Sequence, residues 1–170
     1  MLMSGYSIDQ INFSDINADG TFSPSKQIIL KNKSVSYKYM LNNNDVLLPS
    51  TIQTSAKAKV LNPNGGILLY KGVYSSNIVV LRLEEENQIY SPSELCTILN
   101  TEPIQQQLLQ EVYSKGKIKA ISMEKLRHFK IPVIEEGTLK QELKAYTDYK
   151  IKMQNQEKKI NILMKDILSK

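Results

Sequence analysis

Residues Gly137 to Lys170 read GTLKQELKAYTDYKIKMQNQEKKINILMKDILSK. Gly137 marks a boundary, Thr138 to Gln141 has the pattern of a helix capping box, and neither Gly nor Pro follows the box. Residues on one face then recur at alternating spacings of three and four for about three and a half heptads. This pattern predicts a single long helix with an interface along that face. The predicted interface comprises Leu139, Leu143, Tyr146, Lys150, Met153, Glu157, Ile160, Met164 and Ile167.

A helix of this length would extend over about 45–48 Å. A solitary helix with one apolar stripe has nothing against which to bury that stripe, so it needs its own domain, a second copy or another protein. In one antiparallel register of two copies, Lys150 of one helix lies within about a turn of Glu157 of the other, and such a polar pair would fix the register. The pattern therefore predicts a coiled coil, with a homodimer as the first expectation.

The positive charge of the chain is concentrated in the same stretch. The whole chain of 170 residues has a net charge of +5. Residues 139–170 contain eight lysines and four acidic side chains, a net +4, while the other residues contain fourteen basic and thirteen acidic side chains, a net +1. A basic region attracts polyanions such as nucleic acid, although surface helices are also rich in lysine for solubility.

The first 80 residues have the pattern of a β-rich domain. Short apolar runs alternate with turn-forming residues such as Asn42–Asn44 and Asn62–Gly66. The run Ile78–Leu81 is continuous in its apolar character, which is typical of a strand buried on both faces. The predicted strands are Gln27–Leu30, Asp45–Leu48, Lys59–Leu61, Ile67–Tyr70 and Asn77–Leu81.

Short helices are predicted to follow the strands. Ser91 to Glu94 is a capping box with proline at the first helical position, and a second helix is expected over Ile104–Ser114, ending before Gly116. Ile118–Ile121 is expected as a strand, Ser122 as the cap of a short helix, and Ile131–Val133 as extended chain. We therefore expect an α+β fold: a β-rich domain over residues 1–137 and a long helix over residues 138–170.

Several classes of chemistry lack the residues that they need. His128 is the only histidine, which excludes histidine-based metal clusters, and Cys96, the only cysteine, is expected to be a small buried apolar side chain. The acidic run Glu84–Glu86 is expected to be a solvated loop, and no glycine-rich nucleotide loop is present. We expect neither catalysis nor a metal or cofactor. With no signal peptide and no membrane-spanning run, a reduced cytoplasmic setting is expected.

Several short segments share an order and spacing over about 130 residues. They are Ile11–Ile16 with Gly20, Asn44–Leu48, Gly72–Ile78, Leu99–Thr101, then Gly116, Ile121-Ser122, Leu126 and Ile131-Pro132, and finally Gln141 at the head of the long helix. In this order they resemble the target-recognition domain and conserved helix of type I restriction–modification specificity subunits. Asn44 stands where that family has glycine, and because Asn also adopts the left-handed region we expect the turn to be retained.

This resemblance implies a function and partners. Each recognition domain of the family reads half of a split site in double-stranded DNA, the conserved helices pair antiparallel as a spacer, and methyltransferase subunits, which carry the chemistry, dock on the helices. A complete subunit has two domains and two helices, so the resemblance implies a half-subunit that pairs with itself or with another half. Family domains also carry an earlier strand, so we expect a compact variant or a missing natural N-terminus.

The candidate DNA contacts are small polar, basic and aromatic residues. Glutamine can pair with adenine, Ser and Thr suit several bases, and lysines suit phosphates. Three alternating lysines would share one face if they lie on a strand. The candidates are Ser50, Thr51, Gln53, Thr54, Ser55, Lys57 and Lys59 after the Asp45 strand, Tyr70, Lys71 and Tyr74, and Lys115, Lys117 and Lys119.

Two alternative functions remain open from the sequence. The chain could be the recognition domain of a fused restriction–methyltransferase, which an upstream methyltransferase motif in the reading frame would decide. It could instead be a coiled-coil adaptor that does not bind DNA. A salt titration separates the adaptor from the DNA-binding hypotheses, because phosphate contacts weaken steeply as salt rises.

Overall fold

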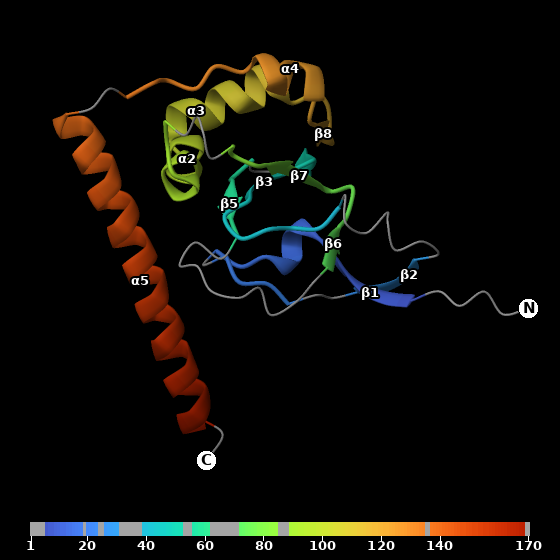
Figure 1. Cartoon of the computed structure of the whole chain (residues 1–170). Coiled ribbons are helices and arrows are strands. Elements are labelled where there is room, and N and C mark those ends of the chain that lie inside the picture. Colours follow the sequence, from blue (N-terminus) through green and yellow to red (C-terminus); the bar gives the residue numbers. More distant parts are fainter. Residues whose placement is uncertain are drawn as a thin grey trace, which may run out of the picture. The chain divides into compact units, whose positions relative to one another are not determined.

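A computed structural model of the chain describes residues 6–18, 20–23, 26–30, 39–52, 56–61, 72–84, 89–134 and 137–168. It divides into two compact units, Met1–Pro132 and Val133–Lys170 (Figure 1). The first unit combines small sheets with short helices, and the second is dominated by one long helix. The fold is therefore mixed α+β with a long C-terminal helix, as the sequence predicts.

The first sheet is built on the N-terminal strand. β1 (Tyr6–Ile11) pairs antiparallel with β2 (Lys26–Leu30) and parallel with β6 (Gly72–Tyr74). Between β1 and β2 the chain makes a short 3-10 helix, η1 (Phe13–Asp15), in which the Asp15 carboxylate accepts hydrogen bonds from the backbone N–H and the side chain of Asn12. This turn directs Ile11 and Ile16, both almost completely buried, into the same core.

The second sheet forms the middle of the first unit. β3 (Val46–Pro49) lies between β5 (Lys59–Val60) and β7 (Ile78–Leu81), antiparallel to both, and is buried along its whole length. In β7, Ile78 and Val79 are buried, while Val80 and Leu81 are half-buried, so burial on both faces holds only for its first half. The strand predicted at Ile67–Tyr70 lies outside the described residues.

The core lies between these two sheets. Its central cluster is Ile11, Ile16, Leu41, Leu47, Leu61 and Ile78. The two sheets and the short helices lie in successive layers, with the β5-β3-β7 sheet between the helices and the β2-β1-β6 sheet (Figure 1). Helix α2 (Pro92–Leu99) contacts β3 and β5. It starts at the predicted capping box, where Ser91 Oγ accepts from the Glu94 amide and the Glu94 carboxylate accepts from the Ser91 amide. Cys96 is buried, as expected.

The second predicted helix differs from the expectation in form and length. α3 (Glu102–Gln107) continues as a π-helical turn, η3 (Leu108–Val112), and the helix ends at Val112 rather than Ser114. Tyr113 is already extended. The wider π turn places both Leu108 and Val112 in the core with no exposed surface, so burial of these apolar side chains, rather than Gly116, sets the end of the helix.

The chain then forms β8 (Lys119–Ala120) and α4 (Met123–His128), whose N-cap Ser122 accepts from the Lys125 amide as predicted. In the second unit, α5 (Thr138–Leu168) is an uninterrupted helix of 31 residues. Thr138 is already helical, so the predicted capping position is off by one residue. Gly137 precedes the helix with φ of 148°, a conformation that favours glycine.

Candidate nucleic-acid interface

The structure joins two of the three predicted DNA-contact segments in one small sheet. β4 (Thr51–Ile52) pairs antiparallel with β8, with Thr51 opposite Ala120 and Ile52 opposite Lys119. The Ile121 amide also donates to the Ser50 carbonyl over 2.8 Å. Thr51 is exposed, whereas Ile52 is buried and attaches the strand to the core. Residues about 70 positions apart in the sequence are thus neighbours in one sheet.

A basic loop extends from this sheet. The predicted single strand face of Lys115, Lys117 and Lys119 is not formed, because residues 115–118 are bends and β8 contains only Lys119 and Ala120. Instead the loop closes at its base, where the Ser114 amide donates to the Ala120 carbonyl over 2.9 Å and the Ala120 amide donates to Ser114 Oγ over 3.0 Å. Lys115 and Lys117 are exposed on this loop, and Lys119 is half-buried in the strand.

A buried tyrosine, Tyr113, links the end of β3 to the β4–β8 sheet. The Tyr113 hydroxyl donates to the Pro49 carbonyl over 2.6 Å, directly before Ser50 and Thr51, and the side chain is 1% exposed. Burial raises the pKa of this phenol above its ordinary value, because the phenolate would lose its solvation. Tyr113 also bridges to Ile121 beyond β8. It therefore fixes the end of β3 relative to the β4–β8 sheet.

The segment after β4 is held by the corner between α2 and α3. Asn100 binds the backbone of Ala58 twice: its Oδ1 accepts from the Ala58 amide over 2.7 Å, and its Nδ2 donates to the Ala58 carbonyl over 2.9 Å. Gln105 Nε2 donates to the Ala56 carbonyl over 3.2 Å. Between these two anchored residues Lys57 is exposed. The candidates Gln53, Thr54 and Ser55 lie outside the described residues.

Lys59 has an intrachain role. Its Nζ donates to the carbonyls of Ile16 over 2.6 Å and Phe13 over 3.1 Å, and it lies 4.4 Å from the centre of the Phe13 ring. Burial lowers the pKa of this ammonium. The ammonium thus binds the carbonyl groups at the end of η1, and these contacts would compete with a phosphate for Lys59. Lys57, in contrast, is exposed.

The aromatic candidates do not join this surface in the described residues. Tyr74 lies on β6 in the other sheet, is half-buried against the central cluster, and packs edge-on against Tyr39 at 5.7 Å between ring centres. Tyr70 and Lys71 lie outside the described residues. The β4–β8 sheet is consequently the place where predicted contacts meet.

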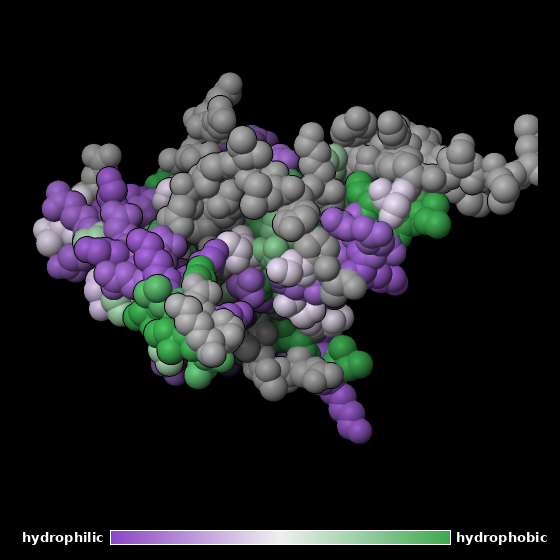
Figure 2. Space-filling model, turned by 90° about the horizontal axis from the view of Figure 1, so that it is seen from below, coloured by the Kyte–Doolittle hydropathy of each residue, from purple (hydrophilic) through white to green (hydrophobic). Residues whose placement is uncertain are grey.

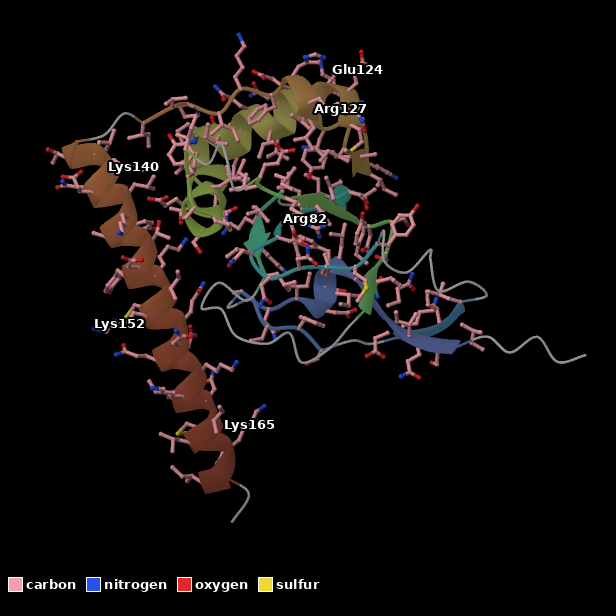
Figure 3. All side chains as sticks on the ribbon, viewed as in Figure 1. Arg82, Glu124, Arg127, Lys140, Lys152 and Lys165 are labelled. Atoms are coloured by element: carbon pink, nitrogen blue, oxygen red, sulfur yellow. The ribbon has the colours of Figure 1, made fainter. Side chains whose placement is uncertain are left out.

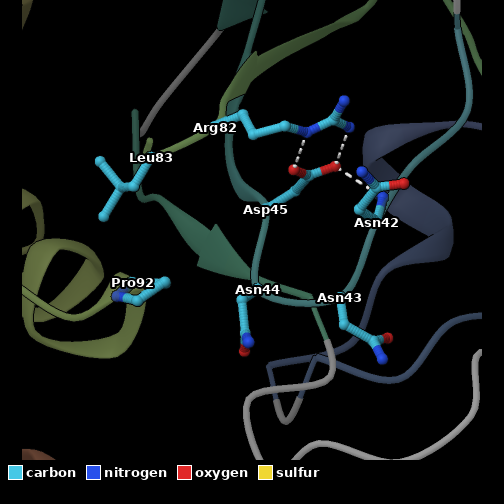
Figure 4. A pocket seen from close by; sticks show the side chains of 7 residues that line it. All are labelled: Asn42, Asn43, Asn44, Asp45, Arg82, Leu83 and Pro92. Atoms are coloured by element: carbon cyan, nitrogen blue, oxygen red, sulfur yellow. Dashed lines mark hydrogen bonds and ion pairs between the residues drawn. The ribbon is translucent and has the colours of Figure 1, made fainter. Parts of the chain in front are cut away.

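An ion pair that the sequence did not reveal lies at the other end of β3. Asp45 is 1% exposed, and its carboxylate accepts from Arg82 Nε and Nη2, each over 2.7 Å, and from the Asn42 amide over 2.7 Å (Figure 4). The hydrogen bonds to Asp45 raise the pKa of the Arg82 guanidinium. Together with Asn43 and Asn44 these residues line a concavity of about 410 Å³. An arginine that follows a strand is not part of any sequence pattern, so the ion pair between Arg82 and Asp45 could be found only from the structure.

The second candidate surface is a face of α5. Large apolar side chains remain exposed along it: Leu139, Tyr146, Tyr149, Met153, Ile160, Leu163, Met164, Ile167 and Leu168, while Ile162 is exposed on the side that carries Lys165. Of the other predicted interface residues, Leu143 and Lys150 are half-buried and Glu157 is exposed. Near the C-terminal end of α5, hydrophobic and hydrophilic residues lie on different sides of the helix (Figure 2). Charged side chains such as Lys140, Lys152 and Lys165 project from it (Figure 3).

The exposed face is wider than the predicted one. Tyr149 and Leu163 were not among the predicted interface residues, yet they continue the stripe through Tyr146, Met153 and Ile160. Their own spacing of three and four residues from those neighbours is the signal that could have identified them. The apolar face is therefore widened at Tyr149 and Leu163, while the polar Gln156 occupies the equivalent position between them.

In the part of the chain that the structure describes, neither a metal site nor a membrane-spanning helix is found. There, no three His, Cys, Asp or Glu side chains group to bind a metal, and no helix is both long and apolar enough to cross a membrane. His128 is exposed on α4. No protein-family model and no curated protein matches the chain.

Proposed function

We propose that the chain is a DNA-recognition module, one half of a type I specificity component, that binds duplex DNA through the β4–β8 sheet. The observation that carries this proposal is the pairing of Thr51–Ile52 with Lys119–Ala120, which unites small polar and basic groups from two distant segments. Sequence-specific binding needs two kinds of contact: lysines that bind the phosphates of the DNA backbone, and polar groups such as hydroxyls that contact the edges of the bases.

The α5 face supports the second half of the proposal, which is pairing with another copy as a coiled coil. Exposed apolar side chains extend from Leu139 to Leu168. Water contact along such a stripe is unfavourable by about 25 cal/mol per Å² of apolar surface, so a partner helix would stabilise it. Two modules joined in this way would read a two-part site and present it to methyltransferase subunits.

The proposal is tested by measuring the affinity of the full chain for duplex DNA at increasing salt. We expect log affinity to fall linearly with log salt concentration, and the double variant Lys115→Ala/Lys117→Ala to reduce the slope by about two. Lys26→Ala is the matched control, because Lys26 is exposed on β2 in the other sheet. Absence of DNA binding even at low salt would favour the adaptor function instead.

A further inference from the structure

An exposed isoleucine lies at the end of the basic loop. Ile118 is 63% exposed and directly follows Lys117. One exposed apolar residue is ordinary on a protein surface, so its position decides what it means. Here the apolar side chain lies within a lysine-bearing loop that adjoins exposed Thr51, on the surface where the predicted contacts meet.

The loop that carries Ile118 is fixed at both ends. Its base is closed by the two hydrogen bonds between Ser114 and Ala120, and β8 is paired with β4. Immediately beyond, the Ser122 amide donates to the Val112 carbonyl over 3.0 Å. A side chain on a loop anchored in this way loses little conformational freedom on binding, which favours a specific contact.

The chemistry of the loop suits one kind of surface. Lysines at 115 and 117 attract a polyanion, whereas isoleucine gains free energy only against an apolar surface. A groove of duplex DNA offers both a polyanion and an apolar surface, because phosphates border the groove and the bases present thymine methyl groups and ring faces. The loop presents a single apolar side chain among its lysines, which is little area for insertion into a lipid surface.

We propose that Ile118 is a specificity-determining residue that makes an apolar contact with a base, while Lys115 and Lys117 hold the flanking phosphates. This inference rests on the proposed DNA-binding function and adds to it a direct apolar contact that the sequence did not indicate. Ile118 then contributes to the choice of bases, and the two lysines contribute affinity without choice.

The test is selection of binding sites from random duplexes by the full chain and by Ile118→Ala. We expect the wild-type chain to recover a defined site, and Ile118→Ala to lose about tenfold in discrimination at one or two positions while its salt slope is unchanged. Ile29→Ala is the matched control, because Ile29 is 75% exposed on β2 and lies in the other sheet. It should recover the wild-type site. Both side chains are exposed, so both variants should fold.

The outcomes separate this inference from the function on which it rests. If the wild-type chain recovers no site, both are wrong. If it recovers a site and Ile118→Ala recovers the same one with equal stringency, or binds all sequences uniformly less well, the base contact alone is wrong. Binding to anionic phospholipid vesicles that is lost in Ile118→Ala, without DNA binding, would indicate a lipid surface. If Ile118 contacts a thymine methyl group, replacing that thymine by uracil should weaken binding. If Ile118 instead inserts between bases, 2-aminopurine at an adjacent adenine position should become more fluorescent on binding.

Discussion

At the scale of single residues, the turn before β3 depends on two polar residues with different tasks. Asn44 adopts φ of 66°, the left-handed conformation that the turn requires and that Asn tolerates. Asp45 then accepts hydrogen bonds from the Asn42 amide and from Arg82, which joins the start of β3 to the end of β7. The Asn-Asp pair therefore stabilises the middle sheet, and this role is independent of any DNA contact.

Replacing Arg82 by alanine should destabilise the first unit. The buried Asp45 carboxylate would lose both bonds from the guanidinium, and because Arg82 is itself half-exposed, water can replace them in part. We expect a loss of about 2 kcal/mol in the free energy of unfolding, measured by urea denaturation. Arg82→Lys should recover only part, since one ammonium cannot span both oxygens. Arg127→Ala, on the exposed face of α4, should change stability by less than about 0.5 kcal/mol, and a similar loss there would contradict the assignment.

Replacing Tyr113 by phenylalanine tests the support beneath the β4–β8 sheet. The variant leaves the buried Pro49 carbonyl without its donor and should lose about 1–2 kcal/mol at neutral pH.

The same variant has a predictable pH dependence. Burial raises the pKa of Tyr113 above the ordinary 10.0, so the folded state binds the phenolic proton more tightly than the unfolded state. This stability is fully present below pH 10 and is lost as the pH rises above it, by about 1.4 kcal/mol per unit. The difference in the free energy of unfolding between wild type and Tyr113→Phe should therefore become smaller between pH 9 and 11, as measured by urea titration. A constant difference would mean that Tyr113 ionises equally in both states.

At the scale of elements, local patterns predicted the helices well. The capping box at Ser91, the cap at Ser122 and the uninterrupted stretch after Gly137 depend on neighbours within four residues, so the sequence alone contains them. Those features that depend on tertiary packing were missed. The π turn at Leu108–Val112 follows from the fit of two side chains into the core, and the strand predicted at Ile118–Ile121 is limited to Lys119 and Ala120, which pair with β4.

The candidate site was predictable in its parts and not in its arrangement. Small polar and basic residues identified the two segments that β4 and β8 join, but no local pattern predicts a pairing across about 70 residues. For the same reason the sequence could not distinguish Lys57, which is exposed, from Lys59, whose ammonium binds the carbonyl end of η1. Ile118 carried no polar signal at all.

Charge substitution on α5 tests the proposed helix pairing. Ile160→Glu and Leu163→Glu each place a carboxylate within the exposed apolar stripe, where it would be desolvated in a dimer. We expect each to shift the chain from dimer to monomer in sedimentation equilibrium at micromolar concentration. Lys165→Glu changes the charge more but lies on the opposite side of the helix by its spacing, so it should remain dimeric. Equal dissociation by all three would point to net charge, and a wild-type monomer would exclude self-pairing.

At the scale of the whole molecule, the division of labour between two units makes their lengths meaningful. Under the proposed function, the first unit would determine which bases are read, and α5, a helix of 31 residues and about 46 Å, would determine how far apart two such units read them. In an antiparallel pair the length of the helix is thus a ruler for the DNA site. A folded-back helix, or an adaptor that binds another protein, would impose no such relation.

Lengthening α5 by one heptad therefore gives the decisive measurement for the assembled module. Repeating Lys150–Gln156 keeps the apolar face in phase and extends the helix by about 10 Å, equivalent to about three base pairs of duplex. We expect binding-site selection to recover the same two half-sites with about three more base pairs between them, at similar affinity. Lys165→Glu, which leaves the length unchanged, should keep the original spacing. Recovery of the original spacing by the lengthened helix would show that α5 does not separate two recognition units, even if each unit still binds DNA.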